Sequence, residues 1–339
     1  MIRSVKFWIG CFVLAAHVGS SLVHQFVFDS NIKKVVVLYN EKGEAVKAAP
    51  LPASLEMPFG TDRQGYDMFA KVVQGAKYTI PFAILIALLR VVIAFFIAIP
   101  YAFYFPLWAR KGLEKLLSSF YYVPLTILAI FLLQPVLTEQ LSGDKEYFTY
   151  SFFMRIFLEV SILTLLVVPL VSVMIGNILI TAQLKEEFIQ SSQVLGAGKL
   201  RIFMKHVVPH LLPKLFIVVT QQCVSALIIF AHLGYFQLFF GGTDVCYAPF
   251  CDIPPQSISN EWSGLIGEYY QNIFAHPLIA LGPVIMFGIA IYSFNLVTEG
   301  LKTHFESGRQ REKADREEEK EDKIVTGSTN FKFINQEGA

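Results

Sequence analysis

The chain has 339 residues, of which 54% are hydrophobic and 16% charged, with a formal net charge of +1. Soluble domains carry about 25% charged residues, so this composition excludes an ordinary soluble fold. The small net charge and the lack of a basic cluster argue against nucleic acid as a partner. Because a bilayer-spanning helix needs about 20 mostly apolar residues and several such runs are present, the sequence predicts an all-α integral membrane protein.

The apolar runs predict six transmembrane helices, at residues 5–28, 78–105, 117–137, 152–178, 215–240 and 277–301. The first run has two interpretations, because a short basic head before an apolar centre also occurs in cleaved signal peptides. Apolar residues resume after that centre, which is longer than a usual signal sequence. We therefore favour a retained transmembrane helix over residues 1–28.

Polar segments separate the predicted spans. Residues 29–77 form a long loop in which β-branched residues bracket Asn40–Gly43, a pattern that favours a small β-hairpin. A second long loop covers residues 241–275, and residues 302–339 form a charged tail that we expect to be disordered or loosely helical. The core of the protein is expected at residues 78–301, with a polar, basic segment at residues 181–214.

The basic residues of the short loops predict the orientation. They gather in the loops between spans two and three and between spans four and five, and such loops normally lie in the cytoplasm. Both termini are then cytoplasmic, and residues 29–77 and 241–275 face outward. The outer loop contains Cys246 and Cys251, which form either a local disulfide or two free thiols. Their spacing, without histidines, predicts no metal site.

The segment at residues 181–214 has helical periodicity. The apolar residues that follow this spacing are Leu200, Phe203, Met204, Val207, Val208, Leu211 and Leu212. Gly196 lies before them, where glycine permits a sharp turn between two amphipathic helices. Two interpretations remain open: a surface that docks into a groove of a cytosolic partner, or a connector that lies on lipid headgroups.

The same segment resembles a motif of a known family. Gln190-Ser191-Ser192, then Gly196, then His206-Val207-Val208-Pro209 follow the spacing of the EAA loop of ABC-importer permeases. The family's Glu-Ala-Ala is replaced here by glutamine and two serines. Lys205 to Pro213 looks like the Arg-His-Ile-Leu-Pro-Asn-Ala-Leu-Pro stretch of dipeptide and oligopeptide permeases.

Two further stretches resemble the C-type permease subunit of this dipeptide and oligopeptide importer family. Phe59-Gly60-Thr61-Asp62-Arg63-Gln64-Gly65-Tyr66-Asp67 is similar to its Phe-Gly-Thr-Asp-x-x-Gly-Arg-Asp, with Tyr66 in place of arginine. Phe294 to Leu301 is similar to its Phe-Asn-Leu-Leu-Gly-Asp-Gly-Leu. Three motifs in the family's order cover about residues 59–305.

The resemblance implies a type I ABC-importer permease of six transmembrane helices, with a small extracytoplasmic hairpin after the first. Such a permease forms half of a translocation pathway for peptides in a bacterial cell membrane. The implied partners are a second, B-type permease, two cytosolic ABC ATPases, a substrate-binding protein and the lipid bilayer. The chain has no Walker phosphate loop, so we expect no enzyme activity and no bound cofactor, and ATP and Mg²⁺ are expected on the ATPases.

The resemblance also implies roles for particular residues. Those expected to couple to the ATPases are Gln190, Ser191, Ser192, Leu195, Gly196, Ala197 and Pro209. Polar groups inside spans are costly and usually face a bundle interior or a cavity, so the candidates for lining the pathway are Arg90, Gln134, Glu159, Gln221 and Gln222. The alternative is that these residues bond helices to one another, or that Glu159 pairs with Arg155 one turn away.

Three other functions remain open from the sequence. A permease of the same family could carry a metal chelate or an oligosaccharide. A membrane anchor without a transport role would have no need of Gly196 between two amphipathic helices. An ion-coupled carrier usually shows inverted repeats, and no convincing repeat relates the two halves of this chain.

Overall fold

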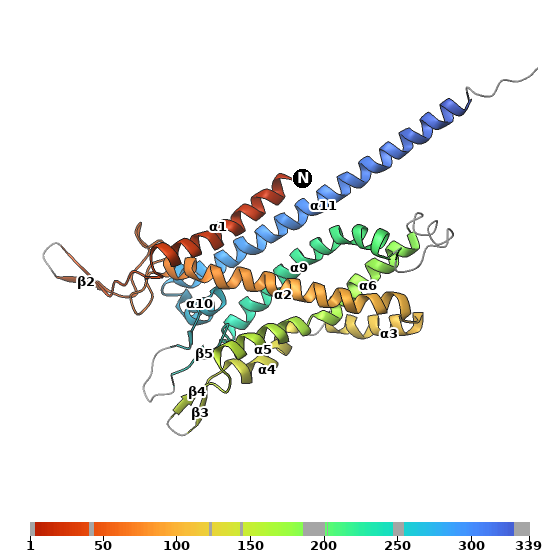
Figure 1. Cartoon of the computed structure of the whole chain (residues 1–339). Helices are drawn as coiled ribbons and strands as arrows, with labels where there is room; N and C mark the ends of the chain where they lie inside the picture. Colours follow the sequence, from red (N-terminus) through yellow and green to blue (C-terminus); the bar gives the residue numbers. More distant parts are fainter. Residues whose placement is uncertain are drawn as a thin grey trace, which may run out of the picture.

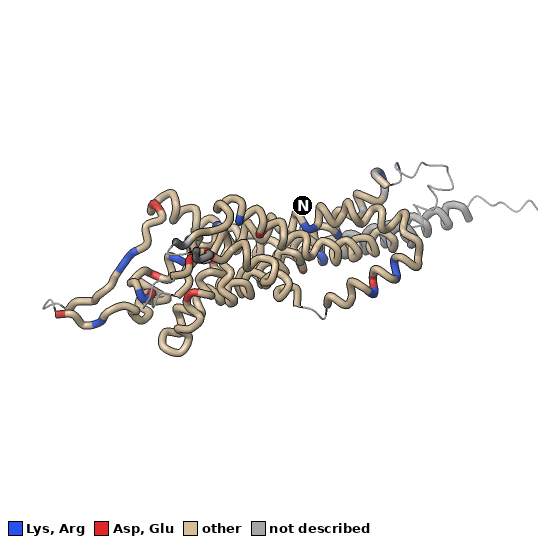
Figure 2. The backbone as a smooth tube through the Cα atoms, turned by 90° about the horizontal axis from the view of Figure 1, so that it is seen from below, with Lys and Arg blue, Asp and Glu red and all other residues tan. Residues whose placement is uncertain are grey.

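A computed structural model describes residues 4–40, 44–121, 124–142, 145–185, 201, 203–246 and 254–328. These residues form an elongated bundle of helices with short β-hairpins at one end (Figure 1). Charged residues are found mostly toward the two ends of the described part, and the backbone between them is largely uncharged (Figure 2). This distribution fits a bundle whose middle lies in hydrocarbon.

The long helices are α1 (Val5–Val27), α2 (Met68–Tyr104), α3 (Leu107–Ser118), α4 (Leu125–Leu137), α5 (Phe152–Leu165), α6 (Val168–Lys185), α9 (Val208–Tyr235) and α11 (Pro277–Ser328). Shorter elements are η1 (Ser119–Tyr121), the π-helical η2 (Phe203–Val207), α10 (Trp262–Tyr269) and η3 (Tyr270–Ile273). The antiparallel pairs are β1 (Val37–Tyr39) with β2 (Ala45–Ala48), β3 (Gln140–Ser142) with β4 (Lys145–Tyr147), and β5 (Thr243–Asp244) with β6 (Gln256–Ser257). The first pair occupies the predicted hairpin, and its location outside the cell remains a prediction.

Four helices among the described residues are long and apolar enough to cross a membrane: α1, α2, and the apolar parts of α9 and α11. The pair α5 and α6 makes a fifth span if it counts as one, bent by 42°. Pro169 explains the bend, because proline has no N–H to donate to the carbonyl four residues earlier.

The predicted third span does not form as one helix over residues 117–137. Helix α3 ends at Ser118, the short η1 follows, and α4 starts only at Leu125, directly after Pro124. Proline disfavours helical backbone at the residue before it. The resulting helix has 13 residues, or about 20 Å at about 1.5 Å per residue, which is short for a bilayer core. The structure therefore supports four or five spans, and the sixth remains a prediction.

Helix α2 forms the centre of the bundle and packs along α1, α6 and α9. Its first turn is capped by Asp67, whose Oδ1 accepts a hydrogen bond from the Phe69 N–H at 3.0 Å. Four alanines along it, Ala83, Ala87, Ala94 and Ala98, are fully buried. Small residues let neighbouring backbones approach closely inside a membrane, which explains how a helix that is apolar on all sides packs so tightly.

Helix α1 packs against α11 through glycines on both helices. A Cβ added to Gly10 would lie 2.5 Å from the Ser293 carbonyl oxygen, and one added to Gly300 would lie 2.6 Å from the Phe7 nitrogen. Lys6 and Glu299 form an exposed ion pair at 2.7 Å beside this contact. The first predicted span is thus an integral part of the described bundle.

The segment at residues 241–275 is more than a polar loop. It contains α10, whose eight residues are all buried and which contacts α2, α9 and α11. Trp262 is 0% exposed, and its indole Nε1–H donates to the Val72 carbonyl at 2.7 Å. The loop therefore folds back into the end of the bundle. The tail is expected from the sequence to be disordered or loosely helical, and α11 continues through it as a helix to Ser328.

Candidate functional site

The predicted coupling residues Gln190, Ser191, Ser192, Leu195, Gly196 and Ala197 lie outside the described residues. The elements on either side of them are described. Helix α6 runs to Lys185, and η2 leads directly into α9, where Pro209 is exposed at the second helical position. Both flanking helices reach the same end of the bundle, next to α3 (Figure 1).

The return into the bundle is anchored by an aromatic residue. The Phe203 ring stacks on Phe95 with centroids 6.4 Å apart and meets the edge of Phe103 at 5.8 Å, both on α2. The periodicity predicts a surface for a partner or for lipid headgroups, whereas Val207 and Leu211 are buried in the bundle and Leu212 is 46% exposed. A displacement of the segment between α6 and η2 would therefore act directly on α2.

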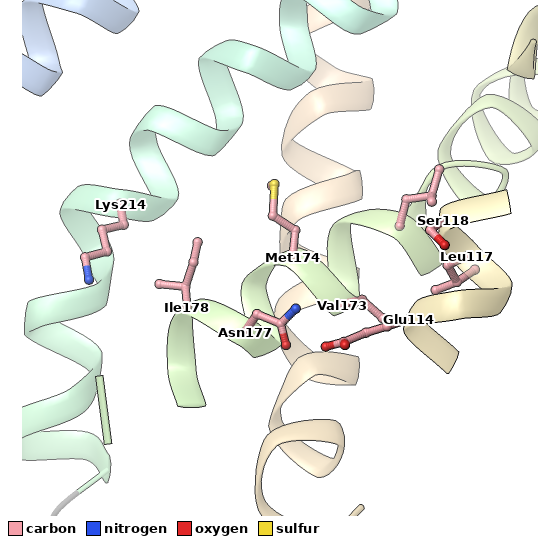
Figure 3. A pocket seen from close by; sticks show the side chains of 9 residues that line it. Glu114, Leu117, Ser118, Val173, Met174, Asn177, Ile178 and Lys214 are labelled. Atoms are coloured by element: carbon pink, nitrogen blue, oxygen red, sulfur yellow. The ribbon is translucent and has the colours of Figure 1, made fainter. Parts of the chain in front are cut away.

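A cavity of about 630 Å³ lies at this same end of the bundle (Figure 3). Its walls come from α3, α6 and α9, and it is lined by Glu114, Leu117, Ser118, Leu170, Val173, Met174, Asn177, Ile178 and Lys214. The Tyr101 hydroxyl is 3.0 Å from Glu114 Oε1 and 3.4 Å from Asn177 Oδ1. The volume is typical of sites for small ligands, and the wall combines apolar side chains with a fixed polar group.

The predicted pathway residues divide into two groups. Gln134 on α4 and Gln221 on α9 are exposed on the described bundle. Arg90 and Glu159 are buried inside it. Glu159 Oε2 accepts a hydrogen bond from the Gly241 N–H at 3.1 Å, while the guanidinium of Arg155 lies over the Phe148 ring at 3.4 Å. These two residues therefore have separate partners and form no ion pair with each other.

Gln222 belongs with the buried group. Its Oε1 lies 3.5 Å from Nη1 of Arg90, so the two pathway candidates contact each other across α2 and α9. The structure brings Arg90 and Gln222 together and leaves Gln134 and Gln221 on the outside of the subunit.

Cys246 is disulfide-bonded. Its predicted partner, Cys251, lies outside the described residues, so the pairing of the two remains a prediction. Within the described ranges no group of three or more potential ligands could hold a metal ion.

The opposite end of the bundle holds a buried polar cluster around the Phe59–Asp67 motif. Asp62 Oδ1 accepts from the N–H groups of Gln64 and Tyr66, and its Oδ2 lies 2.7 Å from Lys71 Nζ and 3.0 Å from the Tyr269 hydroxyl. Gly65 has φ +86, a left-handed conformation that glycine adopts without strain. The motif thus ties the loop before α2 to the end of α10.

Sequence reasoning missed two acidic residues of this end, Glu261 and Glu268. Glu261 accepts hydrogen bonds from the N–H groups of Phe240 and Gly264 and from the Ser263 hydroxyl, and it caps α10. The available signal was the apolar spacing of Trp262, Leu265, Ile266 and Tyr269, which is that of one helical face.

Burial raises the pKa of the Glu268 carboxyl to about 7, although Lys71 and the Ser257 N–H favour its ionised form. In the unfolded chain this carboxyl would titrate near its ordinary value of 4.5. The folded protein then binds more protons between these pH values, so its stability is highest below the unfolded pKa and falls as pH rises through about 7.

We expect the free energy of unfolding to decrease by roughly 2–3 kcal/mol from pH 4.5 to pH 8 through this group. Chemical denaturation of the purified protein in detergent at both pH values measures this difference. The Glu268→Gln variant should show a smaller dependence on pH. An equal dependence in the two proteins would show that Glu268 does not carry it.

A bundle with four or five helices long and apolar enough to cross a bilayer is the architecture of a multi-pass membrane protein. The chain belongs to the family described as the binding-protein-dependent transport system inner membrane component, whose model matches residues 78–311. This is the family that the three sequence motifs predict, and its members are membrane permease subunits of ABC importers, located in the cell membrane.

Individual relatives are more distant. The chain is 22% identical over 250 residues to the glutathione transport system permease protein GsiD of Escherichia coli O1:K1, covering 74% of this chain and 71% of the relative. The same values hold for GsiD of Shigella dysenteriae serotype 1. The nickel transport system permease protein NikC of Escherichia coli K12 is 25% identical over 122 residues, which are 36% of this chain and 39% of NikC.

Proposed function

We propose that this chain forms half of the translocation pathway of an ATP-driven importer of small peptides, paired with a B-type permease. The observation that carries the proposal is that α6 and α9, the described helices on either side of the EAA-like segment in the sequence, both pack against α2 in the helix bundle. GsiD is named for glutathione, which is itself a small peptide. This agrees with the resemblance of the motifs to dipeptide and oligopeptide permeases.

In this proposal two cytosolic ATPases bind ATP and Mg²⁺, and the segment at residues 181–214 binds in a groove of one of them. Ser191 and Ser192 are small enough to let a helix lie deep in a groove, and Gly196 makes the turn. Closure of the ATPases then displaces α6 and α9 together, which is a rigid-body switch of the bundle. Both termini lie in the cytoplasm, and a binding protein delivers the substrate to the opposite end.

The side chains available for a peptide are of two kinds. Gln134 and Gln221 present amides that donate to and accept from a peptide backbone. The cavity of Figure 3 has Glu114 and Lys214 on opposite walls, and these carry the charges that complement the two termini of a peptide. Neither group selects a particular side chain, which suits a permease that accepts a class of peptides.

Gly196→Arg is expected to abolish binding of the ATPases, because a long charged side chain at the turn would block the groove. The measurement is purification of the tagged permease from its host in mild detergent, with mass spectrometry of the proteins recovered. Wild type should recover two ATPases and a second permease. The mutant should keep the second permease and lose the ATPases.

Gly112→Arg is the matched control. Gly112 lies on α3 at the same end of the bundle, and a Cβ there would meet no atom within 4 Å, so this variant should retain the ATPases. Recovery of no ATPase from wild type would contradict the importer function and favour an anchor or a carrier. Equal recovery from the wild-type and Gly196→Arg proteins would remove the coupling role of Gly196.

The nickel relative supports a second candidate, a permease for a metal chelate, through its shared 122 residues. Uptake by proteoliposomes containing the whole complex separates the two. A peptide importer accumulates radiolabelled glutathione or trialanine and leaves nickel outside. Uptake of ⁶³Ni²⁺ with a chelator, and of neither peptide, would favour the second candidate.

A further inference from the structure

The break between α5 and α6 removes the helical donor of the Leu163 carbonyl. In an uninterrupted helix the Leu163 carbonyl would accept from the Val167 N–H. Here the Val167 N–H donates instead to the Thr164 carbonyl at 3.2 Å. Leu163 is buried, and a buried carbonyl without a partner is unfavourable.

A side chain from another helix fills the vacant position. Arg90 of α2 donates to the Leu163 carbonyl from Nε at 3.1 Å and from Nη2 at 2.7 Å. Its Nη1 lies 3.5 Å from Gln222 Oε1 on α9. Arg90 is 0% exposed, so this one guanidinium connects α2, the bend and α9 in the interior of the subunit.

The chemistry of arginine fits this position. Its guanidinium is planar, always charged, and carries five donors in a rigid fork. A charge inside a membrane protein is costly and is usually retained for a function. The contacts with a backbone carbonyl and a glutamine keep the guanidinium in the protein interior.

We propose that Arg90 positions the bend between α5 and α6 and is the fixed point about which α6 tilts during transport. This rests on the proposed coupling function, because α6 runs into the coupling segment and α9 returns from it. When the ATPases displace that segment, the inner half of α6 moves with it. Arg90 holds the last turn of α5, directly before the bend, to α2, so the displacement of α6 becomes a change of the bend angle.

The first experiment measures the bend in the whole importer complex, reconstituted in nanodiscs. Spin labels replace Phe153 on α5 and Ile180 on α6, and their separation is measured by pulsed EPR with and without ATP in a catalytically slow ATPase background. In the wild-type complex the distance between the two labels should have one value without ATP and a different value with ATP. Arg90→Met should show one separation that ATP does not change, and glutathione uptake should fall about tenfold, as for loss of one hydrogen bond to a charged group.

Arg90→Lys is the conservative variant, which keeps the charge and one donor. It should recover part of the ATP-dependent change and of the uptake, whereas a role in bulk packing predicts no recovery over methionine. An unchanged ATP response in assembled Arg90→Met complexes would overturn the proposal. If the distance between the labels in the wild-type complex does not change with ATP, the result contradicts the proposed coupling function itself.

The second experiment is a double-mutant cycle with Pro169→Ala, measured as the thermal stability of the assembled complex. Alanine restores an N–H at residue 169, so the helix can close and the Val167 N–H can return to the Leu163 carbonyl. Arg90→Met should then destabilise less in the Pro169→Ala background than in wild type. The control is Arg155→Met, which removes a second buried arginine, this one in the first turn of α5 and away from the bend. Its effect on thermal stability should be additive with that of Pro169→Ala. Additive effects for Arg90 would overturn the proposal.

Discussion

Replacing Trp262 by alanine is expected to destabilise the protein by about 3–5 kcal/mol, the usual cost of removing a fully buried aromatic side chain. The ring packs edge-on to His17 of α1 and Phe287 of α11, and its N–H bonds to α2. The substitution therefore opens a cavity where three helices meet. Unfolding of the purified protein in mixed detergent micelles, followed by circular dichroism, measures the loss.

Two variants identify the cause of that loss. Trp262→Phe keeps most of the ring and removes the hydrogen bond, so it should cost less. Trp108→Ala removes a tryptophan of α3 that is 79% exposed and should change stability little. If Trp108→Ala destabilised as strongly as Trp262→Ala, packing at α10 would not be the explanation.

Asp62→Ala is expected to destabilise the protein by about 3–5 kcal/mol. The substitution breaks a buried ion pair and leaves the Lys71 ammonium without its counter-charge. The side chains of Asp62 and Lys71 are 2% and 11% exposed. The substitution also removes the acceptor for the N–H groups of Gln64 and Tyr66, so the loop before α2 should open. Denaturation in detergent and proteolysis of the loop report the two effects.

The control for this prediction is the ion pair between Lys33 and Glu56, which has a similar separation of 2.6 Å but is exposed on both sides. Exposed pairs contribute little because water and salt screen them, so Glu56→Ala should leave stability nearly unchanged. Similar losses in the two variants would mean that burial does not set the strength of the Asp62–Lys71 pair.

The sequence predicts the long spans well, because each is a single apolar run: α1, α2, α9 and α11 lie within a few residues of their expected positions or extend beyond them. The apolar spacing of residues 200–212 predicts an outward surface, and only the structure shows that Val207 and Leu211 are buried in the bundle. The sequence alone does not show that helices are interrupted near Pro124 and Pro169. Prolines 81, 100, 135 and 283 lie inside helices that continue past them, so a proline by itself does not mark a break. Tertiary contacts decide which prolines interrupt a helix.

The sequence identifies which polar residues are unusual for a membrane span, but it does not predict where their side chains lie in the bundle. Hydropathy identifies Arg90, Glu159 and the glutamines as unusual, but their positions in the bundle depend on helix rotation, which sequence alone does not give. Glu261 and Glu268 were missed because they lie in a segment whose polar composition resembles an ordinary loop. The coupling residues 190–197 lie outside the described part of the chain and remain predictions from the motif.

The unbroken course of α11 has a geometrical consequence. Its 52 residues correspond to about 78 Å at about 1.5 Å per residue, and Figure 1 shows its far half projecting beyond the other helices. A stiff rod of this length is a lever: a tilt of the whole helix by about 5° about its start at Pro277 carries the far end through roughly 7 Å. Small rotations inside the membrane thus become displacements large enough to measure by fluorescence energy transfer with a dye attached near residue 328.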